Sequence, residues 1–152
     1  MPSLERSALV PYSPEQMFAL IADIERYPEF MADCAAATVD ERGVTEQSVP
    51  FVEATLTIQK VGFKQSFTTR NLLFEPHTMR LNLVRGPFSK LEGEWRFEAL
   101  GEAEQQACKV IFTMDYAFPS RMLGLVAGPI FEKSAEDQVR NLVERARELY
   151  GT

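Results

Sequence analysis

Side chains that could catalyse a reaction are few in this sequence. The chain has one histidine, His77, and two cysteines, Cys34 and Cys108. His77 follows a proline in a predicted turn, where a solvated side chain is a simpler interpretation than a general acid or base. Cys108 lies in an alternating strand pattern that favours a buried, inert thiol, and no base is evident beside Cys34. We therefore expect no catalytic residue, and we expect the protein not to be an enzyme.

The sequence also lacks motifs that hold metals or phosphates. One histidine and two cysteines 74 positions apart do not provide the ligand spacing of a zinc site. Neither a glycine-rich phosphate loop nor a Gly-x-Ser-x-Gly motif is present. We expect no metal and no resident cofactor. The wide cysteine spacing favours a reducing compartment over a disulfide-linked secreted scaffold.

Binding of an apolar ligand requires less specialised residues. It needs a pocket with apolar walls and one or two polar groups that orient the ligand. Ligand binding predicts a continuous tunnel between sheet and helix, and aromatic side chains that fill the tunnel would contradict it. Nine aromatic and aliphatic residues are predicted to line the site: Phe67, Leu81, Leu83, Trp95, Phe112, Met114, Leu123, Val126 and Phe131. The alternative for each of these residues is that its side chain simply fills the core.

The elements that would position these side chains begin with a strand and two short helices. Residues 3–10 alternate with the period of a strand. Ser13 is suited to cap a helix, because Pro14 follows at the first helical position and Gln16 completes a capping box. A second short helix is predicted to begin around Pro28.

The rest of the chain is predicted to form strands and then a long helix. Six strands lie between about residues 34 and 117, with turns at 41–43, 75–77, 85–87 and 101–104. The segment 120–129 is predicted to be the first half of the long helix, kinked near Pro129. The apolar segment 122–131 is a candidate for a lid that opens onto a membrane, or its glycines, Gly124 and Gly128, simply permit close packing of helix and sheet. An apolar stripe predicts that the long helix covers the sheet. Its members are Phe131, Ala135, Val139, Leu142, Val143, Ala146 and Leu149.

This order of elements predicts one α+β domain over residues 1–152, in which a curved antiparallel sheet of about seven strands wraps around the long helix. The formal net charge of −6 disfavours DNA and other generic nucleic-acid partners. The N-terminus lacks a signal-peptide pattern, and the apolar runs are shorter than the ~20 residues that span a membrane. We expect a cytoplasmic bacterial protein, with at most peripheral contact with the inner membrane.

Seven motifs are spread over nearly the whole chain. They are residues 12–18 (YSPEQMF), 23–30 (DIERYPEF), 67–71 (FTTRN), 83–88 (LVRGPF), 107–110 (ACKV), 128–131 (GPIF) and 145–151, which runs from Arg-Ala to Tyr-Gly. With these motifs the chain resembles the family of coenzyme Q-binding proteins and ribosome-association toxins (RatA), within the START-like helix-grip superfamily, which also contains polyketide cyclases. A departure is Ala32-Asp33-Cys34, where relatives usually carry Pro-Trp before the cysteine.

The resemblance implies a helix-grip fold and a cavity for ubiquinone, another polyprenyl quinone or a similar lipid. It also implies that the protein binds the large ribosomal subunit and blocks subunit association. Contact with ribosomal RNA requires a positive surface. Two clusters are candidates, Lys60 with Lys64 and Arg70, and Arg80 with Arg85 and Lys90; basic ribosomal proteins are the alternative contact. The alternative function is a cyclase-like enzyme that acts on an aromatic or polyketide substrate in the same cavity.

Overall fold

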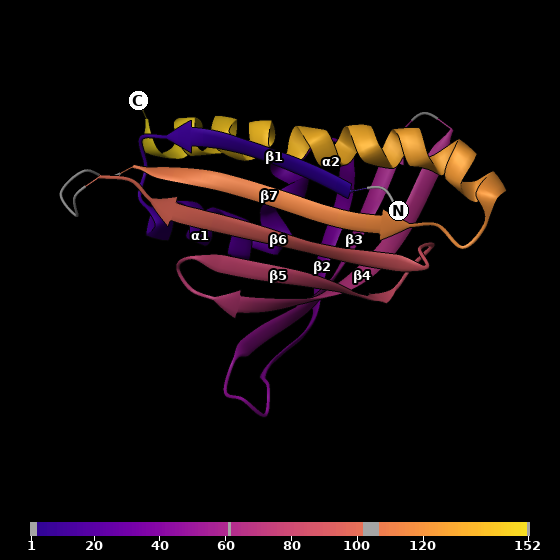
Figure 1. Ribbon diagram of the computed structural model, residues 1–152, viewed down its shortest axis with the longest axis horizontal. Helices are drawn as coiled ribbons and strands as arrows, with labels where there is room; N and C mark the ends of the chain where they lie inside the picture. The colour runs from indigo at the N-terminus through magenta and orange to yellow at the C-terminus, as the bar shows by residue number, and fades with distance from the viewer. Residues whose placement is uncertain (1–2, 61, 102–106, 152) are drawn as a thin grey trace.

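The computed structural model describes residues 3–60, 62–101 and 107–151 and contains one seven-stranded antiparallel sheet (Figure 1). The spatial order of the strands is β1-β7-β6-β5-β4-β3-β2. The strands are β1 (Ser3–Val10), β2 (Cys34–Val44), β3 (Pro50–Lys60), β4 (Phe63–Phe74), β5 (Thr78–Arg85), β6 (Lys90–Ala99) and β7 (Cys108–Ala117). The helices are α1 (Pro14–Ala22), the short 3₁₀ helix η1 (Ile24–Glu29) and the long helix α2 (Arg121–Tyr150).

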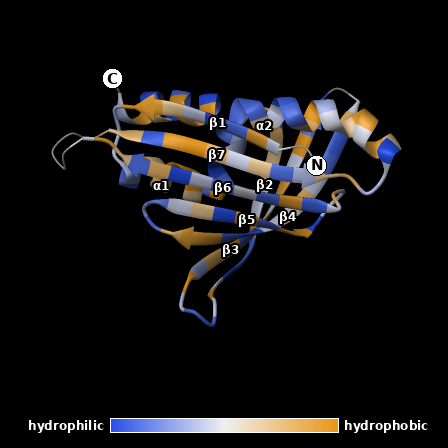
Figure 2. Ribbon diagram, in the orientation of Figure 1, coloured by the Kyte–Doolittle hydropathy of each residue, from blue (hydrophilic) through white to orange (hydrophobic). Residues whose placement is uncertain are grey.

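The sheet curves around α2, as the order of elements predicts. Figure 1 shows α2 running lengthwise beside β1, while β2, β3 and β4 turn behind the other strands. Hydrophobic and hydrophilic residues alternate along the strands (Figure 2), so that one face of the sheet is buried against the helices. No helix among the described residues is long and apolar enough to cross a membrane. The α+β helix-grip fold is thus confirmed.

The first helix begins as its capping residues predict. Oγ of Ser13 accepts a hydrogen bond from the Gln16 amide at 3.1 Å, and Oε1 of Gln16 accepts one from the Ser13 amide at 2.9 Å. The second short helix exists, but its predicted start is wrong: η1 begins at Ile24, and Pro28 lies inside it. Ile24 and Tyr27 are both buried, because residues three apart lie on the same side of a 3₁₀ helix.

One of the predicted turns is also wrong. Residues 41–43 lie within β2, and the chain reverses at Thr45–Val49 instead. Gly43 does not mark a turn here, since the Phe51 ring on β3 occupies the space beside it; an added Cβ would lie 2.8 Å from that ring. The turns at 75–77 and 85–87 are confirmed. Of the turn predicted at 101–104, Gly101 follows β6, and residues 102–104 lie outside the described residues.

A single helix of 30 residues covers the sheet, and Pro129 lies inside it. The hydroxyl of Ser120 accepts a hydrogen bond from the Leu123 amide at 3.1 Å, which caps the first turn. Figure 1 shows the first turns of α2 inclined to the rest of the helix, as expected for an internal proline. The predicted stripe is buried or partly buried from Phe131 to Ala146, but Leu149 is exposed near the end of the helix.

Candidate ligand cavity

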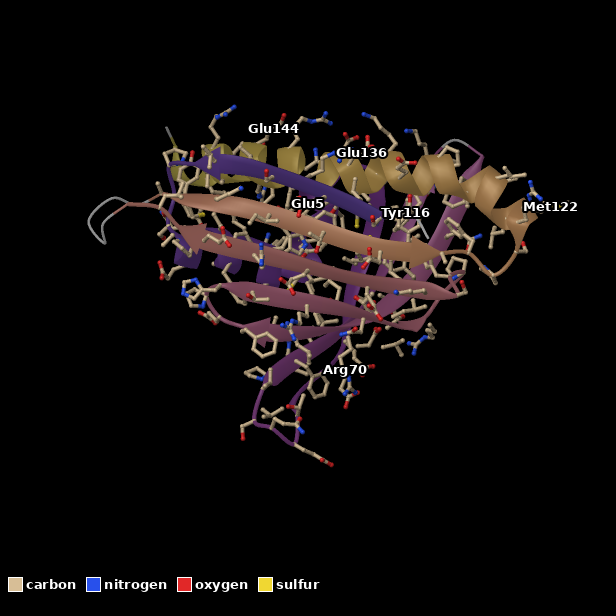
Figure 3. The ribbon with its side chains drawn as sticks, in the orientation of Figure 1. Glu5, Arg70, Tyr116, Met122, Glu136 and Glu144 are labelled. Carbon is tan, nitrogen blue, oxygen red and sulfur yellow. The ribbon has the colours of Figure 1, made fainter. Side chains whose placement is uncertain are left out.

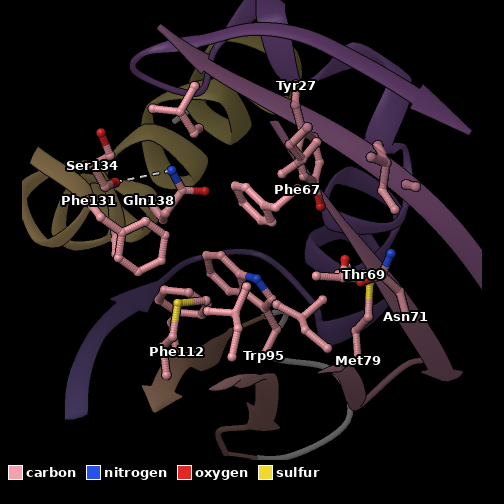
Figure 4. Close-up of a pocket in the computed structure, with 18 residues that line it drawn as sticks. Tyr27, Phe67, Thr69, Asn71, Met79, Trp95, Phe112, Phe131, Ser134 and Gln138 are labelled. Carbon is pink, nitrogen blue, oxygen red and sulfur yellow. Dashed lines mark hydrogen bonds between the residues drawn. The ribbon is translucent and has the colours of Figure 1, made fainter. Parts of the chain in front are cut away.

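A cavity of about 70 Å³ lies between the sheet and α2 (Figure 4). Six of the nine predicted site residues line it: Phe67, Leu81, Trp95, Phe112, Met114 and Phe131. An apolar cavity of about 150 Å³ holds one benzene ring. In this conformation the cavity is therefore smaller than an aromatic ring, and a ring-bearing ligand requires wall side chains to move apart. The other lining residues are Ile24, Tyr27, Ala54, Leu56, Ile58, Thr69, Asn71, Met79, Leu91, Ser134, Ala135 and Gln138.

Aromatic side chains interrupt the predicted tunnel. A second, outer pocket of about 10 Å³ lies under the start of α2, and Phe67 and Phe131 line both pockets. Their ring centroids are 6.4 Å apart, and Phe88 packs against both rings at 5.6 and 4.9 Å. The expectation of a continuous tunnel is wrong for this conformation, because these rings meet edge to face between the cavity and the outer pocket. The cavity itself is not filled by them.

Three predicted site residues do not reach the inner cavity. Leu123 lines the outer pocket, and Leu83 packs on the core without lining either pocket. Val126 points to solvent, with 63% of its surface exposed. The reason is the helical phase: Leu123, Ala127 and Phe131 lie four residues apart and face the sheet, whereas Val126 lies one step of about 100° away from Ala127.

Polar side chains also line the cavity, and the sequence analysis missed them. Thr69 donates a hydrogen bond to Asn71 Oδ1 at 3.0 Å, and Asn71 Nδ2 donates to the Val52 carbonyl at 3.1 Å. On the helix side, Gln138 Nε2 donates to the Ser134 carbonyl at 3.1 Å (Figure 4). The strand period could have identified Thr69 and Asn71. They lie two and four residues after the predicted Phe67 on β4, and residues two apart share a face of the strand.

Tyr27 is the one titratable side chain among the described residues of the cavity wall. Burial raises the pKa of its phenol well above the usual range, and the phenol donates a hydrogen bond to the Ile21 carbonyl. His77 lies outside the cavity in the β4–β5 turn, with Nδ1 3.2 Å from the Phe97 carbonyl. Cys34 and Cys108 are buried free thiols outside the cavity, and burial raises the pKa of each to about 11. The described residues hold no cluster of His, Cys, Asp and Glu suited to a metal ion.

The loop that departs from the family motif is hydrogen-bonded to α2. The Ala32 amide donates to Asn141 Oδ1 at 2.8 Å, and the Ser134 hydroxyl donates to Asp33 Oδ2 at 2.8 Å. At the end of η1, Glu29 accepts a hydrogen bond from Arg145 at 2.7 Å. These contacts join the loop and the end of η1 to α2. The loop therefore takes part in fixing the helix over the cavity without an aromatic side chain at positions 32 and 33.

Carboxylates offset most of the two predicted basic clusters. Arg70 lies 2.6 Å from Glu53, and Arg80 lies 3.2 Å from Glu94. Lys60 and Arg85 lie 3.9 Å from Asp33 and Asp40 respectively. Figure 3 shows Arg70 on the side of the molecule opposite α2. Since four of the six cations have an acidic partner, neither cluster is the strongly positive surface that ribosomal RNA would require.

The fold and cavity together define a START-like helix-grip protein, and solved structures agree. An 18 kDa protein from Caulobacter crescentus matches over 100% of both chains with a TM-score of 0.77 and 25% identity. A START superfamily protein from Mycobacterium smegmatis matches 97% of this chain and 98% of its own, with a TM-score of 0.72 and 19% identity. The Zhui aromatase/cyclase from Streptomyces sp. R1128 matches 99% of this chain and 88% of its own, with a TM-score of 0.66 and 20% identity.

The chain belongs to the polyketide cyclase/dehydrase and lipid transport family, whose sequence model matches residues 10–143. The ribosome association toxin RatA of Escherichia coli (strain K12) is 37% identical over 150 residues, covering 99% of this chain and 90% of that protein. RatA of Pseudomonas aeruginosa is 38% identical and covers 97% of both chains. The mitochondrial coenzyme Q-binding protein coq10 of Schizosaccharomyces pombe is 24% identical, and the match covers 93% of this chain and 84% of that protein. The resemblance seen in the sequence motifs is thus confirmed.

Proposed function

We propose that this protein is a non-catalytic binding protein that holds an uncharged hydrophobic molecule, a polyprenyl quinone such as ubiquinone or a similar lipid. The observation that carries this proposal is the cavity between sheet and helix, whose described wall residues are apolar or neutral. Such a wall favours a neutral ligand, because a buried charge without a partner is strongly unfavourable. The similarity to a protein named for coenzyme Q binding supports the same ligand class.

The wall also supports a binding role more than a catalytic one. A cyclase-like reaction in this cavity would have Tyr27 as its acid or base, and its phenol already donates to a backbone carbonyl. A phenol with a raised pKa is a poor general base near neutral pH. The likeness to an aromatase/cyclase at 20% identity concerns the fold alone.

The ligand enters, in this proposal, beneath the start of α2. The outer pocket lies there, and its side chains Leu123 and Ala127 come from the first turns of the helix. Met122, Leu125 and Val126 belong to the same turns and are 77%, 72% and 63% exposed. Figure 3 shows Met122 projecting from the tip of the molecule. This apolar tip, Met122, Leu125 and Val126, is suited to a transient contact with a membrane surface from which a lipid is taken.

Filling the cavity tests whether it is the binding site. Ala54 lies on β3, lines the cavity and is 1% exposed, so the side chain in Ala54→Leu would occupy much of the free volume. We expect this variant to lose binding of a decyl-tailed ubiquinone. Binding is measured by the quenching of Trp95 fluorescence. The control is Ala99→Leu at the exposed end of β6, which should bind like the parent protein. Unchanged binding by a folded Ala54→Leu variant would place the ligand elsewhere.

We further propose that the protein binds the large ribosomal subunit and opposes subunit association. Support comes from full-length similarity to proteins named ribosome association toxins. Because carboxylates offset the basic clusters, contact through basic ribosomal proteins fits the net charge of −6 better than contact through RNA phosphates.

A further inference from the structure

The single tryptophan of the chain is held rigidly in the cavity wall. Trp95 lies on β6 and is 2% exposed. Its ring stacks on Phe112 with centroids 4.4 Å apart and an angle of 27°, and on Phe97 with centroids 6.4 Å apart and an angle of 14°. Because aromatic rings pack on it from β6 and from β7, the plane of the indole is fixed. The direction of its N–H bond is therefore fixed as well.

The indole N–H has no acceptor within the described part of the protein. Buried tryptophan N–H groups normally donate a hydrogen bond. Figure 4 shows the nitrogen-bearing edge of Trp95 facing the interior of the cavity. Among the described residues, Nε of Arg145 is the one side-chain nitrogen or oxygen that is fully enclosed and has no hydrogen-bond partner. Nε1 of Trp95 has no partner among these residues either, so it is not fully enclosed and borders free space. Trp95 thus presents an unused donor to the cavity.

The neighbouring polar side chains donate their hydrogen bonds to protein groups, and none of these bonds involves the Trp95 indole. Thr69 donates to Asn71, and Asn71 donates to the Val52 carbonyl. Gln138 Nε2 donates to the Ser134 carbonyl from the opposite, helical wall. No charged side chain is present among the described lining residues. A complementary ligand group is therefore an uncharged oxygen that accepts one hydrogen bond, and not a carboxylate or phosphate.

The surroundings of Trp95 also allow a ring-bearing head group to enter. The rings of Trp95 and Phe112 stack on each other, and both side chains line the cavity. Met79 and Met114 line the same cavity, and their flexible thioether chains can repack as a ligand enters. This repacking supplies the extra volume that a ring needs beyond about 70 Å³.

We propose that Nε1 of Trp95 is the donor that recognises the ligand, and that it selects an uncharged ring carrying a carbonyl oxygen. This inference rests on the proposed function, because it assumes that the cavity holds a hydrophobic molecule. It goes further by placing the head group of the ligand beside Trp95 and by naming Trp95 as the residue that sets the orientation of the head group. The tail of the ligand then points toward Phe67 and Phe131, which separate the cavity from the outer pocket.

The indole signal of the single tryptophan tests the proposal without any mutation. Two probes with the same tail, decyl-ubiquinone and decylbenzene, are titrated into protein labelled with ¹⁵N and with ¹³C in the methionine methyl groups. We expect the indole N–H proton of Trp95 to shift downfield with the quinone and not with the hydrocarbon, because only the quinone carries a carbonyl acceptor. An unmoved indole signal, together with shifted Met114 methyl signals, would show binding in the cavity without this hydrogen bond and would overturn the proposal.

The variant Trp95→Phe separates the hydrogen bond from the packing. We expect it to bind decyl-ubiquinone about tenfold more weakly, as expected for loss of one buried hydrogen bond, and to bind decylbenzene with an affinity within about twofold of the parent. Phe112→Leu is the matched control: it removes the stacking partner, keeps the donor and should weaken both probes alike. Equal losses for both probes in Trp95→Phe would overturn the inference. Binding of neither probe by the parent protein would instead overturn the proposed function itself.

Discussion

At the scale of single residues, burial keeps both cysteine thiols protonated at neutral pH. Cys34 and Cys108 are 8% and 0% exposed, and burial raises the pKa of each to about 11. The thiolate is the reactive form. We expect the native protein at pH 8 to react with iodoacetamide far more slowly than the urea-unfolded protein, by about a hundredfold.

The same shift has a consequence for stability at alkaline pH. A raised pKa in the folded state means that the folded protein binds protons more tightly than the unfolded chain. The associated stability is fully present below the ordinary thiol pKa of about 9 and is lost as the pH rises through about 11. The variant Cys108→Ala should therefore show a smaller fall in urea midpoint between pH 8 and 10.5 than the parent. An identical fall in both proteins would contradict the assignment.

The sequence predicted apolar site residues better than polar ones. Phe67, Trp95 and Phe112 could be placed from strand alternation, because residues two apart share a face. The same rule would have placed Thr69 and Asn71, but no particular residues were assigned to the polar groups that orient the ligand. Val126 could not be placed correctly, because an apolar run such as residues 122–131 gives no helical phase until its packing partners are known.

At the scale of elements, the first turns of α2 combine pocket-lining and exposed apolar residues. We predict that Leu125→Glu weakens flotation of the protein with phosphatidylcholine vesicles by about tenfold, since one buried leucine side chain contributes about 1.5–3 kcal/mol. Leu9→Glu is a closely matched control, because Leu9 is 71% exposed against 72% for Leu125. Leu9 is the last but one residue of β1, and Figure 1 shows β1 ending at the side of the molecule away from the start of α2. Equal effects of the two substitutions would contradict a specific role for the start of α2.

Element boundaries show where local sequence rules suffice. The start of α1 was predictable, since Ser13, Pro14 and Gln16 satisfy the helix end by themselves. The start of η1 was not, because the buried positions of Ile24 and Tyr27 in the core decide it. The turn predicted at Gly43 was wrong because the glycine makes room for the Phe51 ring on the next strand. Such a contact between strands cannot be seen in the local sequence.

At the scale of the whole molecule, net charge and ion pairing constrain how a ribosome could be bound. We expect co-sedimentation with large ribosomal subunits that weakens as salt rises from about 50 to 200 mM, because oppositely charged surfaces are screened. Lys64→Glu should change this binding little, since the cluster of Lys60, Lys64 and Arg70 is offset by Asp33 and Glu53. A large loss in that variant would favour contact with RNA phosphates, and absence of binding at every salt concentration would exclude this role.

The overall architecture was predictable because several independent patterns agree on it. Strand alternation, turn residues and the stripe on the last helix all specify a sheet wrapped around one helix. The closed passage was not predictable. Whether Phe67, Phe88 and Phe131 line a tunnel or meet across it depends on ring orientations that only the packed structure defines.

The measurement that tests the central claim most directly is organic extraction of the folded protein from its own host, followed by mass spectrometry. The cavity, with its neutral wall and unused Trp95 donor, predicts a polyprenyl quinone or similar uncharged lipid at about one molecule per chain. The Ala54→Leu protein, prepared in parallel, should yield none. An empty extract from the folded parent protein would contradict the ligand-binding account and would leave the ribosome-directed role as the stronger proposal.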